Sequence, residues 1–316
     1  MSALKHVFIL NPNAGKKKDT EEFCGQIRAA MEGREYEILF TEYAGHAEEL
    51  ARAAAQTGEC VRIYGCGGDG TLNEVVCGAA GYDNAAVTNV PRGTGNDFLK
   101  IFGSNYREAF SDISALADGV QAEMDLIDCN GKFGLGVVCA GVDARIADDV
   151  HKYKRLPLIG GMGAYILALI ENVLFKGISR PATVHVEGET LAGETSIICV
   201  CNGRYYGGGF MPVGEAMPDD GVLDMLYIPK VSLFTLIRMI GKYSKGRYRE
   251  LPHLIRHFHC QKIDFSSDQE MVTVVDGEVM RDRTFTVKLS EKKINFFYPA
   301  YVDYKETAAK ETAGAL

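Results

Sequence analysis

A dense run of glycines around one carboxylate is the feature that most restricts how this chain folds. The run reads Tyr64-Gly65-Cys66-Gly67-Gly68-Asp69-Gly70-Thr71-Leu72-Asn73-Glu74. Residues 61–64 before it resemble a short buried strand, and residues 72–80 after it carry apolar side chains at helical spacing. A strand, a turn without side chains and a helix N-terminus form an anion site, because main-chain N–H groups and the positive end of the helix dipole converge there.

Glycine suits such a turn for two reasons. A Cβ would keep the main chain away from a phosphate, and it would disfavour the positive φ angles that we expect in this loop. We therefore expect a phosphorylated ligand at the turn. Asp69 lies where a metal ion on that phosphate would be held.

Other interpretations of the glycine run stay open. Gly65, Gly67 and Gly70 formally satisfy the dinucleotide fingerprint, which would indicate an NAD-dependent enzyme, but Asn89 and Val90 lie where that fingerprint needs an acidic residue. The run would also serve as a structural turn without a ligand. A Walker A loop is excluded, because the Gly-Lys pair at residues 15–16 lacks the upstream Gly and the following Ser or Thr.

Two further loops of the same kind lie within the first hundred residues. A strand-like segment at residues 7–10 leads into the loop 11–15, and another at residues 86–90 leads into the loop 91–98. In an open α/β sheet such loops gather at the carboxyl ends of the strands, where ligands bind. Three in succession indicate a phosphate site more strongly than one does.

The three loops, in this order, resemble the signature blocks of the soluble diacylglycerol kinase catalytic family, which includes bacterial lipid kinases and the sphingosine and ceramide kinases. The blocks are Asn11-Pro12-Asn13-Ala14-Gly15, Gly67-Gly68-Asp69-Gly70-Thr71-Leu72-Asn73-Glu74-Val75 and Pro91-Arg92-Gly93-Thr94-Gly95-Asn96-Asp97-Phe98. The central block is shared with NAD kinases and phosphofructokinases, whereas the other two narrow the resemblance to lipid kinases. The similarity covers residues from about 5 to about 300.

The organisation of the chain predicts two domains with a boundary near residue 125. Up to there, strand and helix patterns alternate, which predicts a doubly wound α/β domain over residues 1–125. Residues 126–295 carry short strands bounded by Gly, Asp or Ser and predict an all-β sandwich, with helices near 165–175 and 233–243. The resemblance implies the same pair of domains, an active site in the cleft between them, and a return of residues 296–316 to the first domain.

Composition limits the partners and the compartment. The net charge of −8 argues against nucleic-acid binding. Nine cysteines without regular spacing indicate reduced thiols in a cytoplasmic protein. The start of the chain does not resemble a signal peptide, and its longest apolar run, residues 156–170, is broken by Pro157 and glycines. We therefore expect a lipid substrate to be reached by peripheral contact with the inner face of the cell membrane.

The resemblance implies ATP as the phosphate donor and transfers the family's nucleotide site to this chain. That site comprises Asn11, Pro12, Asn13, Ala14, Gly15, Thr41, Gly67, Gly68, Asp69, Gly70, Thr71, Leu72, Asn73 and Thr94. Thr41 would equally be an ordinary residue at a strand end.

The resemblance also implies catalytic carboxylates. Asp69, Asp97 and Asp125 would form an Asp–water–Mg²⁺ network, and Glu278, in an Asp276-Gly277-Glu278 motif, would be the general base. Each also has an ordinary structural alternative, which is weakest for Asp69: a helix N-cap or first-turn acid for Asp97, a turn at the domain junction for Asp125, and a solvated acid on a β-hairpin for Glu278.

A second, structural Mg²⁺ site is implied by the segment 217–223. Asp220 would supply its carboxylate, and Met217 and Val222 would supply main-chain carbonyls. The same residues would also form a plain turn. A third metal hypothesis is weaker: His253 and His257 would share a helical face near His259 and Cys260, without a carboxylate beside them.

Two basic segments, residues 151–155 and 242–256, have the composition of a surface that docks on an anionic bilayer, or of an ordinary solvated face. A sheet edge would allow a homodimer. We expect an ATP- and Mg²⁺-dependent lipid kinase that converts diacylglycerol to phosphatidic acid. The alternatives are a kinase for another lipid alcohol or sphingoid base or for a soluble small alcohol, and a nucleotide sensor without catalysis.

Overall fold

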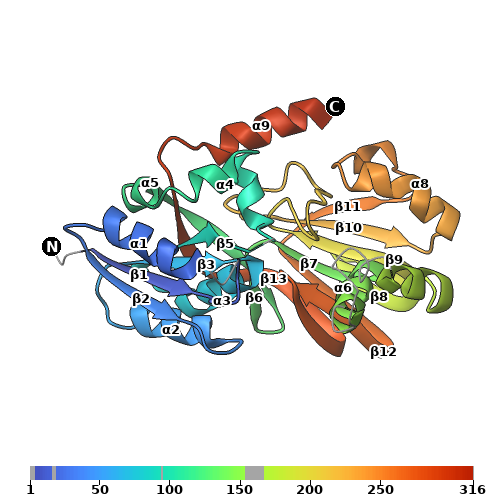
Figure 1. Cartoon of the computed structure of the whole chain (residues 1–316). Coiled ribbons are helices and arrows are strands. Elements are labelled where there is room, and N and C mark those ends of the chain that lie inside the picture. Colours follow the sequence, from blue (N-terminus) through green and yellow to red (C-terminus); the bar gives the residue numbers. More distant parts are fainter. Residues whose placement is uncertain (1–3, 16–18, 94, 154–166, 316) are drawn as a thin grey trace. The chain divides into compact units, whose positions relative to one another are not determined.

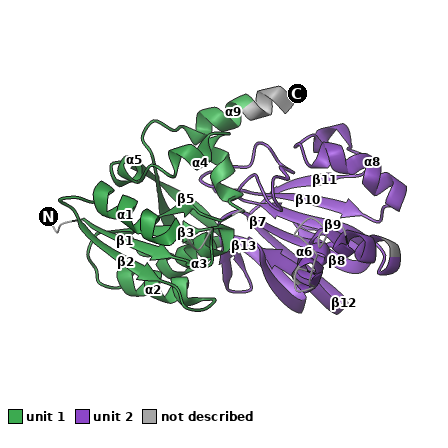
Figure 2. Ribbon diagram, viewed as in Figure 1, with its two compact units in different colours: residues 1–126, 290–310 green, residues 127–289, 311–316 purple. Residues whose placement is uncertain are grey.

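The computed structural model describes residues 4–15, 19–93, 95–153 and 167–315 (Figure 1). The chain divides into two compact units, shown in Figure 2: unit 1 comprises residues 1–126 and 290–310, and unit 2 comprises residues 127–289 and 311–316. The predicted boundary at residue 125 lies one residue from this division, and the return to unit 1 begins at residue 290 instead of 296. None of the helices in the described ranges is long and apolar enough to cross a bilayer.

Unit 1 is built on a parallel sheet. Its strands are β1 (Lys5–Leu10), β2 (Glu35–Phe40), β3 (Val61–Gly67) and β4 (Ala85–Pro91), in the order β4-β3-β1-β2. All neighbours pair in parallel, and the end of β13 (Glu278–Tyr298) adds a further parallel strand beside β4. β1, β3 and β4 are almost continuously buried, as expected for parallel strands covered on both faces.

Helices connect these strands, which confirms the predicted alternation. They are α1 (Thr20–Ala30), α2 (His46–Ala55), α3 (Asp69–Ala79), the 3₁₀ helix η2 (Phe98–Phe102), α4 (Tyr106–Ala109) and α5 (Ile113–Ala117). The single helix expected over 106–117 is wrong. Asp112 interrupts it, because its carboxylate accepts the N–H of Ala115 at 2.9 Å and starts a new helix.

Unit 2 is antiparallel, as predicted for a sandwich. Its strands are β5 (Val120–Cys129, shared with unit 1), β6 (Lys132–Gly134), β7 (Val137–Gly141), β8 (Arg180–Val186), β9 (Glu189–Cys201), β10 (Leu223–Pro229), β11 (Arg256–Cys260), β12 (Lys262–Val275) and the first part of β13. The helices are α6 (Val142–Tyr153), the π-helical turn η3 (Glu171–Phe175), α8 (Leu233–Tyr243) and the 3₁₀ turn η4 (Tyr248–Glu250). The last helix of the chain is α9 (Tyr304–Ala315).

The two largest apolar cores in the described part of unit 2 lie on opposite faces of the strands β7, β9 and β10. The first packs residues of these strands against β8, β12 and β13, and it includes Val138, Val200, Met225, Val184, Phe265 and Phe285. The second packs their opposite face against the helices, and it includes Cys199, Leu226, Val142, Leu236, Met239 and Tyr243. The alternation of side chains along each strand therefore fills both cores.

Several predicted elements of unit 2 are wrong in extent or type. The segments 262–265 and 271–275 belong to one strand, β12, and β13 is a single strand through residue 298. The strand predicted over 133–141 is split at residues 135–136 into β6 and β7. α6 was not expected, and residues 256–260 form a strand where the histidine spacing suggested a helix, because β11 pairs with β10.

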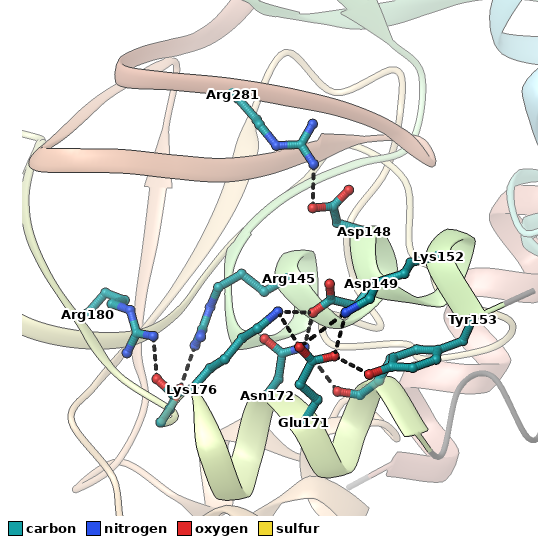
Figure 3. A network of polar contacts seen from close by, with 12 residues as sticks. Arg145, Asp148, Asp149, Lys152, Tyr153, Glu171, Asn172, Lys176, Arg180 and Arg281 are labelled. Carbon is teal, nitrogen blue, oxygen red and sulfur yellow. Dashed lines mark hydrogen bonds and ion pairs between the residues drawn. The ribbon is translucent and has the colours of Figure 1, made fainter.

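A polar network ties α6 to the segment around η3 (Figure 3). Glu171 is its centre: it accepts hydrogen bonds from Tyr153 and from Lys152, and pairs with Lys176 at 3.1 Å. The hydrogen bond from Tyr153, followed by that from Lys176, lowers the pKa of the Glu171 carboxyl to about 2. Lys152, from the basic segment 151–155, is thus paired within the protein, and residues 154–155 lie outside the described part.

In unit 1, His6 is a buried histidine on the first strand. It is 2% exposed, and its Nδ1 lies 2.8 Å from the hydroxyl of Tyr64. Desolvation, with the nearby guanidinium groups of Arg34 and Arg62, lowers the pKa of the His6 imidazole to about 4. The folded protein therefore keeps this ring neutral at pH values where an exposed histidine is protonated.

This burial predicts acid sensitivity. Between pH values of about 6.5 and about 4 the unfolded chain binds a proton at His6 that the folded protein does not, so His6 lowers the free energy of unfolding as the pH falls. His6→Gln should reduce the loss of stability between pH 6.5 and 4.5 by about 2 kcal/mol. Urea unfolding at both pH values measures it, with the exposed His253→Gln as the control. An unchanged pH slope in His6→Gln would contradict the assignment.

Candidate active site

The three glycine-containing loops lie at the carboxyl ends of the adjacent strands β1, β3 and β4. The first two loops are joined by hydrogen bonds: the N–H of Asn11 donates to the carbonyl of Cys66 at 3.2 Å, and the Asn11 amide donates to Thr71 Oγ1 at 3.4 Å. The N–H of Thr41 donates to the Leu10 carbonyl at 2.8 Å, so the end of β2 lies beside them. The predicted residues of blocks one and two are thus brought together.

The second and third loops touch along their main chains. The carbonyl of Gly67 accepts the N–H groups of Arg92 and Gly93 at 2.9 and 3.0 Å. A Cβ on Gly68 would lie 2.9 Å from the carbonyl oxygen of Gly95, and one on Gly93 would lie 2.8 Å from the Cα of Gly68. These glycines are required because no side chain fits between the two loops.

This contact corrects the reason expected for the glycines. Gly65, Gly67, Gly68 and Gly70 do not have positive φ, whereas Gly15 in the first loop does, at +82°. Gly67 is also restricted by packing, since its Cβ would lie 2.2 Å from Thr71 Oγ1. Gly70, in the first turn of α3, is exposed and has open space where a Cβ would be.

Asp69 connects the second loop to the third. Its Oδ1 accepts the N–H of Asp97 at 2.7 Å, and its own N–H donates to the carbonyl of Gly95 at 3.2 Å. A Cβ on Gly95 would lie 2.7 Å from Asp69 Oδ2, so this carboxylate fills the space beside that glycine. Two of the predicted carboxylate residues are therefore held together at the N-terminus of α3.

Asp97 is buried and precedes η2. Its carboxylate does not cap that helix; instead it pairs with Lys100 Nζ at 2.5 Å. The Asp97 side chain therefore does not cap the helix, and it pairs with the Lys100 ammonium group instead.

Asp125 lies inside strand β5 and is 5% exposed, so the alternative of a turn between domains is wrong. Its carboxylate pairs with Lys293 Nζ at 3.2 Å, and Lys293 also pairs with Glu123 at 3.1 Å. The hydrogen bonds to Glu123 and then Asp125 raise the pKa of Lys293. The returning strand β13 thus supplies a cation to this carboxylate.

Some residues that shape the loops were not singled out from the sequence. Asn89 donates to Asn96 Oδ1 at 2.9 Å, and Asn96 donates to the carbonyl of Gly93 at 3.0 Å, so two buried amides support the third loop. Glu74 accepts the N–H groups of Gly45 and Ala47 at 2.9 and 3.1 Å, which anchors the start of α2. The Asn89–Asn96 contact could have been expected from the sequence, because Asn89 lies at the end of a predicted strand just before the third loop.

The remaining predicted nucleotide residues lie in these loops or next to them. Asn13 N–H donates to Asn11 Oδ1 at 2.9 Å and shapes the first loop, which also contains Pro12 and Ala14. Leu72 and Asn73 are buried in α3, where Asn73 accepts from Cys77. Thr94 lies outside the described residues.

The site fits a phosphate group with a hard divalent cation. The first-turn N–H groups of a helix lack intrahelical partners and attract anions, and the open space at Gly70 lies on that turn of α3. The carboxylate oxygens of Asp69 and Asp97 are the ligand type that Mg²⁺ prefers.

In unit 2, the predicted general base lies on a tight hairpin. Asp276 and Gly277 have φ of +46° and +92° and form the two-residue loop between β12 and β13. The Asp276 carboxylate accepts the N–H groups of Leu135, Gly136 and Val137 at 2.6, 2.9 and 2.7 Å, which fixes the hairpin on β7. Glu278 follows directly and is exposed, so its role as a base stays a prediction.

The segment of the second predicted magnesium site forms a turn. Asp220 Oδ1 accepts the N–H of Val222 at 3.0 Å, and Gly221 has a φ of +73°. Asp220 is exposed and Met217 is half-buried. The turn is compatible with both alternatives, and a metal held by Met217, Asp220 and Val222 stays a prediction.

Two family descriptions match the chain. The one described as "Diacylglycerol kinase catalytic domain" matches residues 5–129, and the one described as "YegS C-terminal NAD kinase beta sandwich-like domain" matches residues 136–297. The matches confirm the predicted fold class of an α/β domain followed by a β-sandwich.

Similar proteins include two staphylococcal sequences and a solved structure from Bacillus anthracis. A Staphylococcus aureus (strain Mu3) protein named "Putative lipid kinase" is 25% identical over 292 residues, covering 91% of this chain and 85% of that protein. A Staphylococcus haemolyticus protein also named "Putative lipid kinase" is 29% identical over 234 residues, covering 73% and 74%. The crystal structure of a "putative diacylglycerol kinase" from Bacillus anthracis has a TM-score of 0.72 at 21% identity, with 93% and 96% of the chains covered, and so shares the fold.

The loop packing predicts opposite results for two neighbouring glycines. Gly68→Ala should lower the free energy of unfolding by about 1–3 kcal/mol, because its methyl group would clash with the main chain of the third loop. Gly70→Ala should leave it unchanged or raise it by up to about 1 kcal/mol, because that space is open and Ala is the better helix former. Thermal unfolding compares the two variants, and equal melting temperatures would contradict the packing argument.

Proposed function

Since the chain belongs to the family that joins a diacylglycerol kinase catalytic domain to a YegS-type β-sandwich domain, we propose that it transfers the γ-phosphoryl group of ATP to the hydroxyl group of diacylglycerol, giving phosphatidic acid. The similar proteins are named lipid kinases, a class that is broader than the diacylglycerol kinases. Diacylglycerol as the acceptor, ATP as the donor and Mg²⁺ as the metal ion are our proposal for this member of the class.

The observation that carries the proposal is the junction of two phosphate-type loops at the N-terminus of α3. Asp69 joins them through the N–H of Asp97, and the open side of Gly70 leaves room beside the helix terminus. Main-chain N–H groups would bind the nucleotide phosphates there, without a lysine of the Walker type. The close glycine packing would hold the loops in place, so the N–H groups would be oriented before nucleotide binds.

Asp69, Asp97 and Asp125 would hold Mg²⁺, directly or through water. When bound, Mg²⁺ would neutralise charge on the transferred phosphoryl group. Glu278 would accept the proton of the lipid hydroxyl as its oxygen attacks phosphorus. Its exposure keeps it accessible to a substrate, and the three N–H bonds to Asp276 hold its hairpin in place.

Charge-neutral substitutions test these roles. Asp69→Asn keeps an oxygen that accepts the Asp97 N–H but removes the charge, so it should abolish turnover while the melting temperature stays near that of the parent. Glu278→Gln should lower kcat by about 10²–10⁴-fold, as expected for loss of a general base, with ATP affinity unchanged. Transfer of labelled phosphate from ATP to a panel of lipids measures both.

Each result has a contrary outcome. Parental turnover in Asp69→Asn would show that the metal is held elsewhere, and an unchanged kcat in Glu278→Gln at saturating lipid would assign the base to another residue. Phosphorylation of a sphingoid base or a soluble alcohol in preference to diacylglycerol would replace the acceptor. ATP binding without any acceptor turnover would indicate a nucleotide sensor.

We further propose that α8 places unit 2 on an anionic bilayer. Phe234 and Ile237 are 72% and 64% exposed and lie three residues apart on one helix face, and Arg238 beside them is exposed. Within the described ranges no ion pair involves Arg238 or the exposed Lys245, whereas Lys242 and Arg247 pair with Glu250. Exposed apolar side chains flanked by unpaired cations suit the interface of an anionic membrane.

Replacing both apolar residues should separate binding from chemistry. Phe234→Ser with Ile237→Ser should weaken binding to phosphatidylglycerol vesicles at least about tenfold, from the loss of buried apolar area, and leave kcat on a short-chain soluble diacylglycerol unchanged. Phe175→Ser, at an 81% exposed position outside α8, is the control. An equal loss in both variants, measured by vesicle sedimentation, would contradict docking through α8.

A further inference from the structure

A cluster of two histidines and one aspartate lies at the edge of the β7-β9-β10-β11 sheet in unit 2, on residues that the proposed reaction does not use. Asp224 comes from β10, and His257 and His259 come from β11. In the antiparallel register Asp224 lies opposite His259 and Leu226 lies opposite His257. Because side chains two residues apart share a face, the two imidazoles and the carboxylate point to the same side of the sheet.

The three side chains converge on one oxygen. Asp224 Oδ1 lies 2.6 Å from His257 Nε2 and 3.1 Å from His259 Nδ1. The Asp224 and His257 side chains are only 4% and 16% exposed, whereas His259 is 64% exposed, so solvent reaches the cluster from one side. The imidazole rings are 4.5 Å apart between centroids.

The other nitrogen of His257 has its role set by its neighbours. Its Nδ1 lies 3.2 Å from the hydroxyl of Tyr248. Tyr248 donates its only hydroxyl proton to Glu215, and Arg249 Nε donates to the same hydroxyl oxygen at 3.2 Å. With its hydroxyl proton directed to Glu215, Tyr248 offers His257 a lone pair, which favours the tautomer with the proton on His257 Nδ1.

A neutral imidazole protonated on Nδ1 has a lone pair on Nε2. In His257 that lone pair would face the Asp224 carboxylate oxygen at 2.6 Å, which is repulsive unless a positive charge lies between them. Either a second proton or a metal ion supplies that charge. His259 presents another ring nitrogen to the same point, which a single proton does not need but a metal ion does.

We propose that Asp224, His257 and His259 bind one divalent transition-metal ion of the zinc class. In tetrahedral coordination, ligand atoms about 2.0–2.2 Å from such an ion lie roughly 3.3–3.6 Å from one another. The 3.1 Å pair would therefore open by a few tenths of an ångström and the 2.6 Å pair by about 0.7–1 Å when the ion binds. Two imidazoles and one carboxylate suit Zn²⁺ and its neighbours, whereas Mg²⁺ prefers oxygen ligands alone. Water at the exposed side of His259 completes the coordination.

The surrounding residues match the usual environment of a metal-bound histidine. The hydrogen bonds that link His257 Nδ1 to Tyr248 and Tyr248 to Glu215 orient the imidazole ring. Histidine ligands at most metal sites have such a hydrogen-bond partner on the nitrogen that does not bind the metal. The metal would join the edge strand β11 to β10. The helical pairing of His253 with His257 suggested by the sequence is wrong, and the carboxylate that it lacked comes from Asp224, more than thirty residues earlier in the chain.

Zinc binding to the metal-stripped full-length protein tests the proposal, without nucleotide or lipid, so that its outcome is independent of kinase activity. All variants carry Cys60→Ser, which removes an exposed thiol. Calorimetry should give one equivalent of Zn²⁺, and the protein loaded with Co²⁺ should show a visible absorption band. His259→Ala should weaken Zn²⁺ binding at least tenfold and abolish the band without unfolding the protein, because that side chain is exposed.

Two further variants sharpen the test. His253→Ala removes a nearby exposed histidine outside the cluster and should leave Zn²⁺ affinity unchanged. Tyr248→Phe should weaken binding about tenfold through loss of the hydrogen bond that orients His257. Absence of Zn²⁺ binding in the parent, or equal affinity in the parent and His259→Ala, would overturn the metal site.

Discussion

The loop edge of unit 1 depends on a contact between two pieces of main chain. The loop after β3 and the loop after β4 meet at Gly67, Gly68, Gly93 and Gly95, with carbonyl oxygens and Cα atoms at distances that no Cβ would permit. The Asp69 carboxylate then accepts an N–H from the far side of this contact. Backbone donors near a helix terminus suit an anion only when their positions are fixed, and here glycine packing and hydrogen bonds between the loops hold the main chain in place.

Carboxylates that accept main-chain N–H groups recur through the molecule. Glu74 binds the start of α2, Asp69 binds the third loop, and Asp276 binds the corner between β6 and β7. Each joins segments far apart in sequence, and each lies in or next to a sequence motif from which a catalytic role was predicted. In the Asp276-Gly277-Glu278 motif, one acidic residue holds the architecture, and its neighbour Glu278 is exposed.

The sequence predicted unit 1 closely because local signals coincide there. Buried apolar runs, glycine turns and helical spacing all give the same answer for β1, β3, β4 and α3, and their loops were correctly assigned to one edge of the sheet. The predictions for unit 2 were less accurate, because pairing between distant strands decides its elements. The spacing of His253 and His257 suits a helix, yet pairing with β10 makes residues 256–260 a strand. Likewise, neither Lys293 beside Asp125 nor Asp224 beside His257 is visible from spacing.

The path of β13 has a consequence for biosynthesis. This strand begins in unit 2, and its last residues lie parallel to β4, where Phe296 packs against Phe98 and Phe102 in the interior of unit 1. The strands β1 to β4 therefore lack this neighbour until the whole of unit 2 up to β13 has been synthesised. Until then, the flank of β4 and the aromatic side chains beside it are unprotected, so the nascent chain needs a chaperone or rapid synthesis more than a domain closed on itself would.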